Sequence, residues 1–208
     1  MELPPPGELS SPIAEVRNRA TAVLVCAPVL DRGERCVCRS LLVDEGEEAW
    51  YARLSFRRSV SDQLSEFRRY GHVLPEGAIF VQVRGGIERV RDPADRVPDD
   101  LSVVVRTVTD PGSISRLGVA LTDLERTHTN EGDRLHVCVD SLTALLQYAE
   151  LEQVVQFVQV ANEFTRATGG DIHYHLDPNA HDTETVATIR HLVDTVVHVD
   201  ESGHVDIQ

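Results

Sequence analysis

Three histidines in one short segment, residues 170–182, carry the side chains of this sequence best suited to holding a metal ion. Side chains of a β-strand alternate between its two faces, so His173 and His175 share a face if the segment is extended. Together with His181 and a neighbouring aspartate, they would form a His₃ or His₂–carboxylate set that suits zinc or iron. The alternative, which we favour from sequence alone, is a strand end whose histidines form local hydrogen bonds, since neutral histidine is an ordinary buried partner.

The four cysteines show no metal-binding spacing of their own. Cys26 and Cys138 lie within apolar runs, where a free cysteine packs as a small hydrophobic side chain. Cys36 and Cys38 form a C-x-C pair, which lacks the paired C-x₂-C spacing of a zinc ribbon. We therefore expect reduced thiols, as is usual in the cytoplasm, and no bound cofactor.

The charge balance excludes two classes of partner. The 208 residues include 34 acidic and 20 basic side chains, for a net charge of −14, and every one of the 20 is an arginine. Binding to nucleic acid or to an anionic membrane surface needs a basic face, so we expect neither. An acidic, lysine-free composition suits folding in concentrated salt, where charge repulsion is screened, and it indicates a halophilic archaeal protein. The alternative is an acidic mesophilic protein from a GC-rich genome.

The sequence shows no targeting or membrane-spanning segment. Its apolar runs are shorter than the roughly 18 residues that a membrane-spanning helix needs. The N-terminal residues have neither the basic nor the apolar region of a secretory signal. We therefore expect a cytoplasmic protein.

Strand-like and helix-like segments alternate along the chain, which is typical of an α/β domain. Residues 1–12 hold four prolines and are expected to form a flexible arm, and residues 13–208 a single domain. The alternation predicts a three-layer sandwich, in which helices cover both faces of a mostly parallel sheet. We expect strands over residues 21–28, 48–56, 78–83, 101–108, 134–140, 171–176 and 195–199, and helices over 13–20, 33–42, 59–70, 113–124, 141–168 and 183–193.

Three segments resemble parts of the RecA/KaiC-like ATPases of the P-loop superfamily. The run from Leu135 to Leu146 is similar to the Walker B strand, which ends in Asp-Ser-Leu-Thr before a helix. The stretch from Trp50 to Gly71 resembles the KaiC-like pattern of a strand, S-F-x-x-S-x-x-Q-L, a helix and a glycine, and Ile189 to Val199 resembles the last strand. The chain is also similar to short haloarchaeal HTR-like or KaiC-like proteins of unknown function. The resemblance covers most of residues 20–200 and implies a RecA/KaiC-like fold.

The residues that handle phosphate in that family are replaced here. A P-loop needs G-x-x-x-x-G-K-[ST], because its backbone amides wrap the phosphates and its lysine reaches the β- and γ-oxygens. The equivalent stretch, residues 27–35, has one glycine, no lysine and no serine or threonine. Arg57 and Arg58 stand where the family carries catalytic glutamates. Asp140, the Walker B aspartate, is retained, but in the family it acts on a metal ion that nucleotide and P-loop already hold.

We therefore expect a non-catalytic RecA/KaiC-like domain, a pseudo-ATPase with a regulatory or signal-transducing role and no catalytic residues. It would bind a protein partner or a small ligand at the degenerate nucleotide edge. The candidate residues there are Asp31, Arg32, Arg35, Asp140 and Ser141, of which Asp140 and Ser141 are also expected to cap the following helix. The chain would act with an unidentified protein partner or as a homo-oligomer, as RecA-like rings do.

Two alternatives stay open at this point. One is a divergent nucleotide-binding ATPase that uses Arg32 or Arg35 together with Asp140. The other is a metal-binding sensor built on His173, His175 and His181. Both alternatives would place the functional residues at the carboxyl edge of the sheet.

Overall fold

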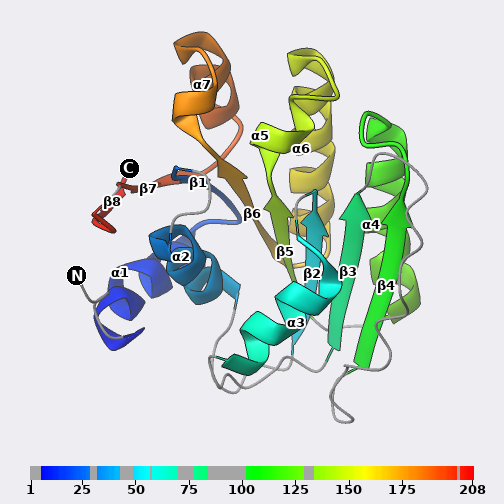
Figure 1. Ribbon diagram of the computed structural model, residues 1–208, viewed down its shortest axis with the longest axis horizontal. Helices are drawn as coiled ribbons and strands as arrows, with labels where there is room; N and C mark the ends of the chain where they lie inside the picture. Colours follow the sequence, from blue (N-terminus) through cyan, green and yellow to red (C-terminus); the bar gives the residue numbers. More distant parts are fainter. Residues whose placement is uncertain are drawn as a thin grey trace.

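The computed structural model describes residues 6–28, 32–42, 49–56, 58–69, 77–83, 102–128, 134–200 and 202–208, and within them eight strands form one sheet between two layers of helices (Figure 1). The strands are β1 (Ala22–Cys26), β2 (Ala49–Ser55), β3 (Gly77–Val83), β4 (Ser102–Val108), β5 (Arg134–Asp140), β6 (Asp171–Leu176), β7 (Thr195–Val199) and β8 (Val205–Ile207). The helices are α1 (Pro6–Arg19), α2 (Arg32–Leu42), α3 (Val60–Arg69), α4 (Ile114–His128), α5 (Leu142–Leu145), α6 (Leu151–Ala167) and α7 (Thr183–Arg190), with a 3₁₀ turn η2 (Pro178–Ala180). The expected three-layer α/β architecture is thus confirmed.

The sheet is parallel except at one end. Its strand order is β4-β3-β2-β5-β6-β1-β7-β8, and only β8 runs antiparallel, against β7. In the centre, Arg53 of β2 lies opposite Cys138 of β5, and Cys138 lies opposite His173 of β6. Residues opposite one another in parallel strands point to the same face, so this register decides which side chains can meet.

One face of the sheet is apolar and packs against α4, α5, α6 and α7. Burying these side chains provides the main favourable free energy of folding, at about 25 cal/mol per Å² of apolar surface. The residues of β2, β5 and β6 on this face alternate with the polar residues described below. They are Trp50, Ala52, Leu54, Leu135, Val137, Val139, Ile172, Tyr174 and Leu176, and they form one cluster with Leu117, Leu121, Leu145, Val154, Phe157 and Ile189 of the helices.

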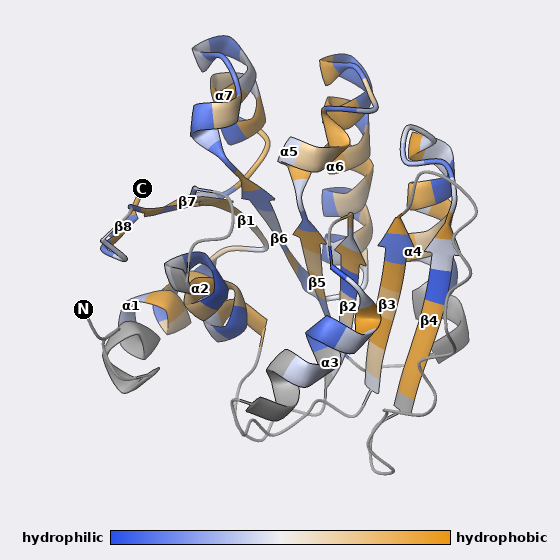
Figure 2. Cartoon of the chain, in the orientation of Figure 1, coloured by the Kyte–Doolittle hydropathy of each residue, from blue (hydrophilic) through white to orange (hydrophobic). Residues whose placement is uncertain are grey.

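The opposite face is covered by α1, α2 and α3 and is apolar only toward its two sides. On one side, Val37 and Leu41 of α2 pack with Val25 of β1. On the other side, Tyr51 and Phe80 form an edge-to-face pair with ring centroids 6.1 Å apart. Between these clusters lie β5 and β6, and Figure 2 shows hydrophilic colours along β6 inside the sheet. Strand β6 is thus polar although it lies in the middle of a covered sheet. Buried polar groups cost free energy unless they are hydrogen-bonded, so these side chains require partners.

Residues 6–12, which were expected to be part of a flexible arm over residues 1–12, are helical in the structure. These residues belong to α1, which begins at Pro6 and ends at Arg19. Proline fits the first position of a helix, because its missing N–H has no intrahelical partner there and its fixed φ is close to helical. Residues 1–5 lie outside the described part of the chain.

Two further elements differ from the sequence-based expectation. The single helix expected over residues 141–168 is two helices, because Glu150 starts α6 afresh with a capping box that it shares with Gln153. Strand β8 was not expected, and it extends the sheet by pairing with β7. None of the helices in the described segments combines the length and the apolar character needed to cross a bilayer.

Candidate functional site

Three neighbouring strands present a buried row of polar side chains to α2 and α3. Because β2, β5 and β6 are parallel and in register, every second residue of each strand faces the same helices. Burying polar groups costs free energy unless they are paired, so a row of this length requires a set of internal partners. The row consists of Tyr51, Arg53, Ser55, His136, Cys138, Asp140, Asp171, His173 and His175.

At the carboxyl edge of the sheet, Asp140 is held by arginine. Arg53 Nη2 donates a hydrogen bond of 2.7 Å to Asp140 Oδ2, and both side chains are buried. Arg58 Nε lies 3.8 Å from the same carboxylate oxygen. A buried charge pair of this kind satisfies both groups and leaves the Asp140 carboxylate engaged inside the protein.

The other residues expected at this edge have separate roles or positions. Ser141, joined to Asp140 by a cis peptide bond, caps α5 by accepting a hydrogen bond of 3.3 Å from the Ala144 amide, as expected. Asp140 does not share that role, because its carboxylate pairs with Arg53 instead. Arg35 is half-buried in the first turn of α2. Arg32 begins α2, but Asp31 and the Arg32 side chain lie outside the described part of the structure.

In the middle of the row, two cysteines and two histidines come together beneath α2. Cys38 of α2, Cys138 of β5, and His173 and His175 of β6 each offer one atom that lies within 4.8 Å of the other three. Cys38 Sγ is 3.8 Å from Cys138 Sγ and 3.3 Å from His173 Nε2. All four side chains are buried, the most exposed at 4 %. Thiolate sulfur and imidazole nitrogen are the ligands of soft and borderline metal ions, so this group is well suited to hold one.

The protonation of this group is set by its members and by Glu34. A hydrogen bond from Cys138 is the main reason why the pKa of Cys38 lies well below its usual range, although burial opposes the shift. Burial raises the pKa of the Cys138 thiol, and donating to Cys38 raises it further. Burial works against the charge of His175, but Cys38 and Glu34 outweigh it and raise the pKa to about 10. Burial lowers the pKa of His173.

The structure brings together only part of the metal set expected from sequence. His173 and His175 do share a face, but among the described residues their companions are Cys38 and Cys138, and His181 is not in the group. The chain leaves the sheet after β6 through η2, which puts His181 beyond the strand end, where it is half-buried. The sequence held a signal for Cys138, which alternates with His136 and Asp140 on an otherwise apolar strand. Nothing in the sequence placed α2 over that strand.

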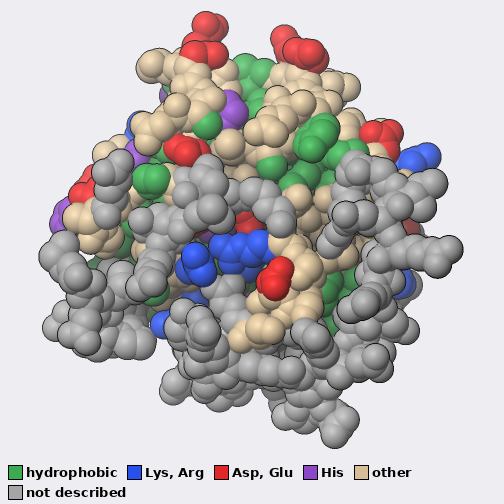
Figure 3. All heavy atoms as spheres, viewed as in Figure 1, with side chains coloured by type: hydrophobic (Ala, Val, Ile, Leu, Met, Phe, Trp, Pro, Cys, Tyr) green, Lys and Arg blue, Asp and Glu red, His purple; other side chains and the backbone are tan. Residues whose placement is uncertain are grey.

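At the amino-terminal end of the row, a histidine and a carboxylate form a second pair. His136 Nδ1 lies 2.7 Å from Asp171 Oδ2, and Arg134 Nη2 lies 3.7 Å from the same oxygen. The polar row thus divides into a histidine–carboxylate pair, a cysteine–histidine cluster and an arginine–carboxylate pair. Figure 3 shows basic side chains gathered near the centre of this face of the molecule.

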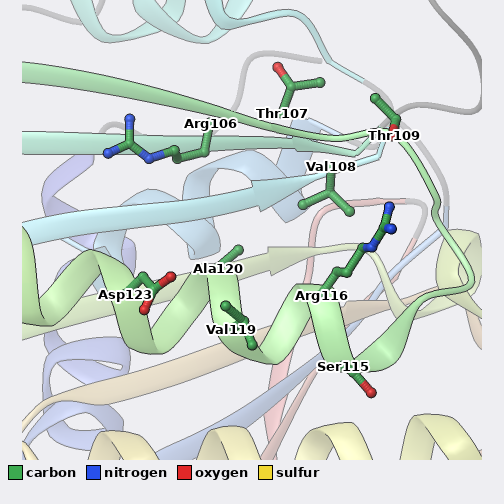
Figure 4. A pocket seen from close by; sticks show the side chains of 9 residues that line it. All are labelled: Arg106, Thr107, Val108, Thr109, Ser115, Arg116, Val119, Ala120 and Asp123. Carbon is green, nitrogen blue, oxygen red and sulfur yellow. The ribbon is translucent and has the colours of Figure 1, made fainter.

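A separate pocket of about 370 Å³ lies between the edge strand β4 and α4 (Figure 4). Arg106 and Thr107 of β4 line one wall, and Arg116, Val119 and Asp123 of α4 line the other. The lining thus carries two arginines and one aspartate. It is built by strands and helices other than those of the polar row.

Three solved archaeal structures have a similar fold. The protein studied as Project ID PH0250 from Pyrococcus horikoshii OT3 matches with a TM-score of 0.57 and 11% identity, over 90% of this chain and 85% of that one. The uncharacterized protein PH0321 from Pyrococcus horikoshii, crystallised with an unknown peptide, matches with a TM-score of 0.54 and 10% identity, over 94% and 87%. The flagellar accessory protein FlaH from Methanocaldococcus jannaschii matches with a TM-score of 0.50 and 8% identity, over 86% and 70%.

The sheet order, the helical layers and these neighbours define a RecA-like fold. No curated protein matches the chain at a significant level. Within this class, the chain belongs to DUF7504, a family of unknown function whose model matches residues 20–199.

Proposed function

We propose that this protein is a non-catalytic RecA/KaiC-like domain, which serves a regulatory or signal-transducing role by binding a partner protein or a small ligand. The observation that carries the proposal is the 2.7 Å hydrogen bond between Arg53 and Asp140. It fixes the one retained residue of the family's catalytic set in an internal ion pair. The fold would then be kept as a binding scaffold after hydrolysis was lost.

Charge repulsion explains why this pair opposes magnesium. In P-loop NTPases the Walker B aspartate acts on a Mg²⁺ ion held by nucleotide and by the P-loop hydroxyl. An ion on the Asp140 carboxylate would lie about 4 Å from the Arg53 guanidinium, where a divalent and a monovalent cation repel by about 8 kcal/mol at an effective dielectric constant near 20. Phosphate contacts would have to offset that cost, and residues 27–35 lack the lysine and hydroxyl that supply them.

The pocket between β4 and α4 is the place we propose for a ligand or a partner side chain. Its volume of about 370 Å³ lies within the range typical of small-molecule sites. Arg106 and Arg116 favour an acidic group, such as a carboxylate of a small molecule or of a partner's acidic segment. PH0321, whose fold is similar, was crystallised in complex with an unknown peptide. We propose peptide binding for this chain by analogy with that fold.

Equilibrium binding of a fluorescent ATP analogue with Mg²⁺, and release of inorganic phosphate from ATP, test the proposal. Both are measured in about 2–3 M KCl, where charge repulsion within this acidic chain is screened. We expect neither saturable binding nor phosphate release above a protein-free blank. Phosphate release that Asp140→Asn abolishes would overturn the proposal and favour the divergent ATPase. Saturable binding of the ATP analogue without phosphate release would contradict the proposal that the domain no longer recognises nucleotide.

A further inference from the structure

We propose that Cys38, Cys138, His173 and His175 form a structural zinc site that fastens α2 to the centre of the sheet. The inference does not depend on the proposed function, since it concerns different residues and a different ligand. It rests on the geometry of the four side chains, on their burial and on the partner that Glu34 provides.

The spacing of the four ligand atoms is close to that of a tetrahedral zinc site. Bonds of about 2.3 Å to sulfur and 2.0–2.1 Å to nitrogen put two sulfurs about 3.8 Å apart and a sulfur and a nitrogen about 3.5 Å apart. Cys38 Sγ lies 3.8 Å from Cys138 Sγ and 3.3 Å from His173 Nε2. The widest separation in the cluster is 4.8 Å, so it must shorten by about 1 Å on binding.

The two sulfurs are placed as ligands rather than as a disulfide. A disulfide needs an S–S distance of about 2.05 Å, well below the 3.8 Å between Cys38 and Cys138. Two cysteines and two histidines make a four-ligand set that leaves no open position, which is the arrangement of structural and not of catalytic zinc. Two thiolates also balance the charge of Zn²⁺, so a buried site of this composition carries no net charge.

Three ring nitrogens of the cluster lack hydrogen bonds. Within the described residues, His173 Nδ1 and both ring nitrogens of His175 are buried without a hydrogen bond, although His175 Nδ1 lies 2.8 Å from Glu34 Oε1. A buried polar atom without a partner costs about 1–3 kcal/mol, and native structures rarely leave one without a reason. A metal ion among the four side chains would engage the free nitrogen of His175 and remove that cost.

Glu34 supplies the outer partner that zinc-binding histidines usually have. Its Oε1 lies 2.8 Å from His175 Nδ1, on the side of the ring away from the free Nε2. Zinc-bound histidines almost always give their second ring nitrogen to a carboxylate or carbonyl, which fixes the tautomer and the ring orientation. Glu34 precedes Cys38 by one helical turn, so α2 carries both a ligand and its supporting carboxylate on one face.

The site explains how α2 is held over a polar strand. Residues 27–35 lead into α2 and lack the phosphate-binding pattern that the resemblance would place there, so no nucleotide would anchor the start of this helix. A zinc ion bonded to Cys38 above and to Cys138, His173 and His175 below would link α2 directly to β5 and β6. Metal affinity then adds to the free energy of folding.

Metal content of the wild-type protein is the first test. The protein is produced with zinc in the medium, purified without chelator under reducing conditions in concentrated KCl, and analysed by mass spectrometry for metals. We expect one zinc ion per chain. Cys138→Ser and His175→Gln should lose the ion, whereas Cys36→Ser should keep it. Cys36 is the matched control, because it lies on α2 two residues from Cys38 and outside the cluster.

A second measurement keeps the proposal falsifiable if the ligand variants do not fold. Metal-free wild-type protein is titrated with Co²⁺, and we expect tetrahedral cobalt–thiolate absorption that saturates at one equivalent and is bleached by Zn²⁺. Glu34→Gln should keep that spectrum but bind zinc about 10–100-fold more weakly, since it changes only the partner of a ligand. Wild-type protein without zinc and without the cobalt spectrum would overturn the proposal. So would loss of two thiols to a Cys38–Cys138 disulfide in protein that binds no zinc.

Discussion

Arg53 of β2 and Asp140 of β5 form an ion pair across neighbouring strands, 2.7 Å between Nη2 and Oδ2, with side-chain exposures of 7% and 1%. Arg53 lies opposite Cys138, two residues before Asp140, so the guanidinium reaches diagonally toward the carboxyl end of β5. This pairing holds the Asp140 carboxylate inside the protein, next to a buried guanidinium.

Removing one member of the ion pair should destabilise the protein, whereas replacing both members by apolar residues should not. Removing one member leaves a buried charge unpaired, so we expect Asp140→Asn to lower the free energy of unfolding by about 3–5 kcal/mol. The double variant Arg53→Met, Asp140→Leu should recover most of that loss. Denaturant unfolding of the single and double variants measures both. Glu15→Gln, which breaks the exposed pair with Arg19, is the control and should change stability by less than about 1 kcal/mol. A change of that small size for Asp140→Asn would contradict the burial argument.

Two glycines should respond oppositely to alanine. A Cβ on Gly170 would collide with the backbone carbonyl of Leu135, which cannot move without disturbing β5, whereas a Cβ on Gly118 meets nothing within 4 Å. We expect Gly170→Ala to destabilise the fold by about 1–3 kcal/mol. Gly118→Ala lies inside α4 and should stabilise it by about 0.5–1 kcal/mol. Thermal unfolding of the two variants measures both effects. Equal changes in unfolding temperature would show that the close approach of Gly170 to β5 is not present in solution.

The N-terminal cap of α7 should stabilise the fold in a pH-dependent way. Asp182 accepts a hydrogen bond of 2.7 Å from the Thr185 amide, and this bond lowers the pKa of Asp182. A pKa that is lower in the folded state means that the cap stabilises the fold above about pH 4 and that this stability is lost as the pH falls through the folded pKa. The stability difference between wild type and Asp182→Ala should therefore be constant near neutral pH and narrow in acid. A difference that does not narrow would show that the charge of Asp182 is not involved. Asp182→Asn keeps an acceptor without a titrating charge, and its stability relative to Asp182→Ala should not vary with pH.

The net charge of −14 should make folding depend on salt. Screening weakens the repulsion among surface carboxylates, so we expect the unfolding temperature to rise between about 0.1 and 2 M KCl and then to level off as the Debye length falls to about 3 Å or less. Circular dichroism melts over this range measure the effect. An unfolding temperature that is unchanged or falls would contradict the halophilic interpretation of the composition.

Sequence patterns predicted the architecture well because the apolar strands are strongly marked. The runs around Val137 and Leu24 are fully buried in the sheet, as their composition indicates, and the Asp-Ser-Leu-Thr segment ends β5 as the resemblance implies. Helix boundaries were less predictable. Pro6 opens α1 where a proline-rich arm was expected, and the capping box at Glu150 divides what reads as one continuous apolar helix.

The cysteine–histidine cluster was only half visible in the sequence. Alternation on β6 placed His173 and His175 on one face, but Cys138 reads as a core residue because its apolar neighbours dominate the pattern. Cys38 joins them through tertiary packing of α2, which no local spacing encodes. Likewise, the pairing of Asp140 with Arg53 depends on β2 lying beside β5, although the two strands are some 80 residues apart in the chain.

Thermal unfolding of the wild-type protein with Mg-ATP or Mg-ADP tests the central claim most directly. The protein is melted in about 2–3 M KCl beside wells with Mg²⁺ alone at matched ionic strength. A nucleotide present at 100 times its Kd would stabilise the folded state by about 2.7 kcal/mol, which corresponds to a rise of several degrees in Tm. We predict the same Tm with and without nucleotide, because Asp140 is paired with Arg53 and the phosphate-binding pattern is missing. A rise of several degrees with Mg-ATP or Mg-ADP would contradict the account and show that this RecA-like domain binds nucleotide by other residues.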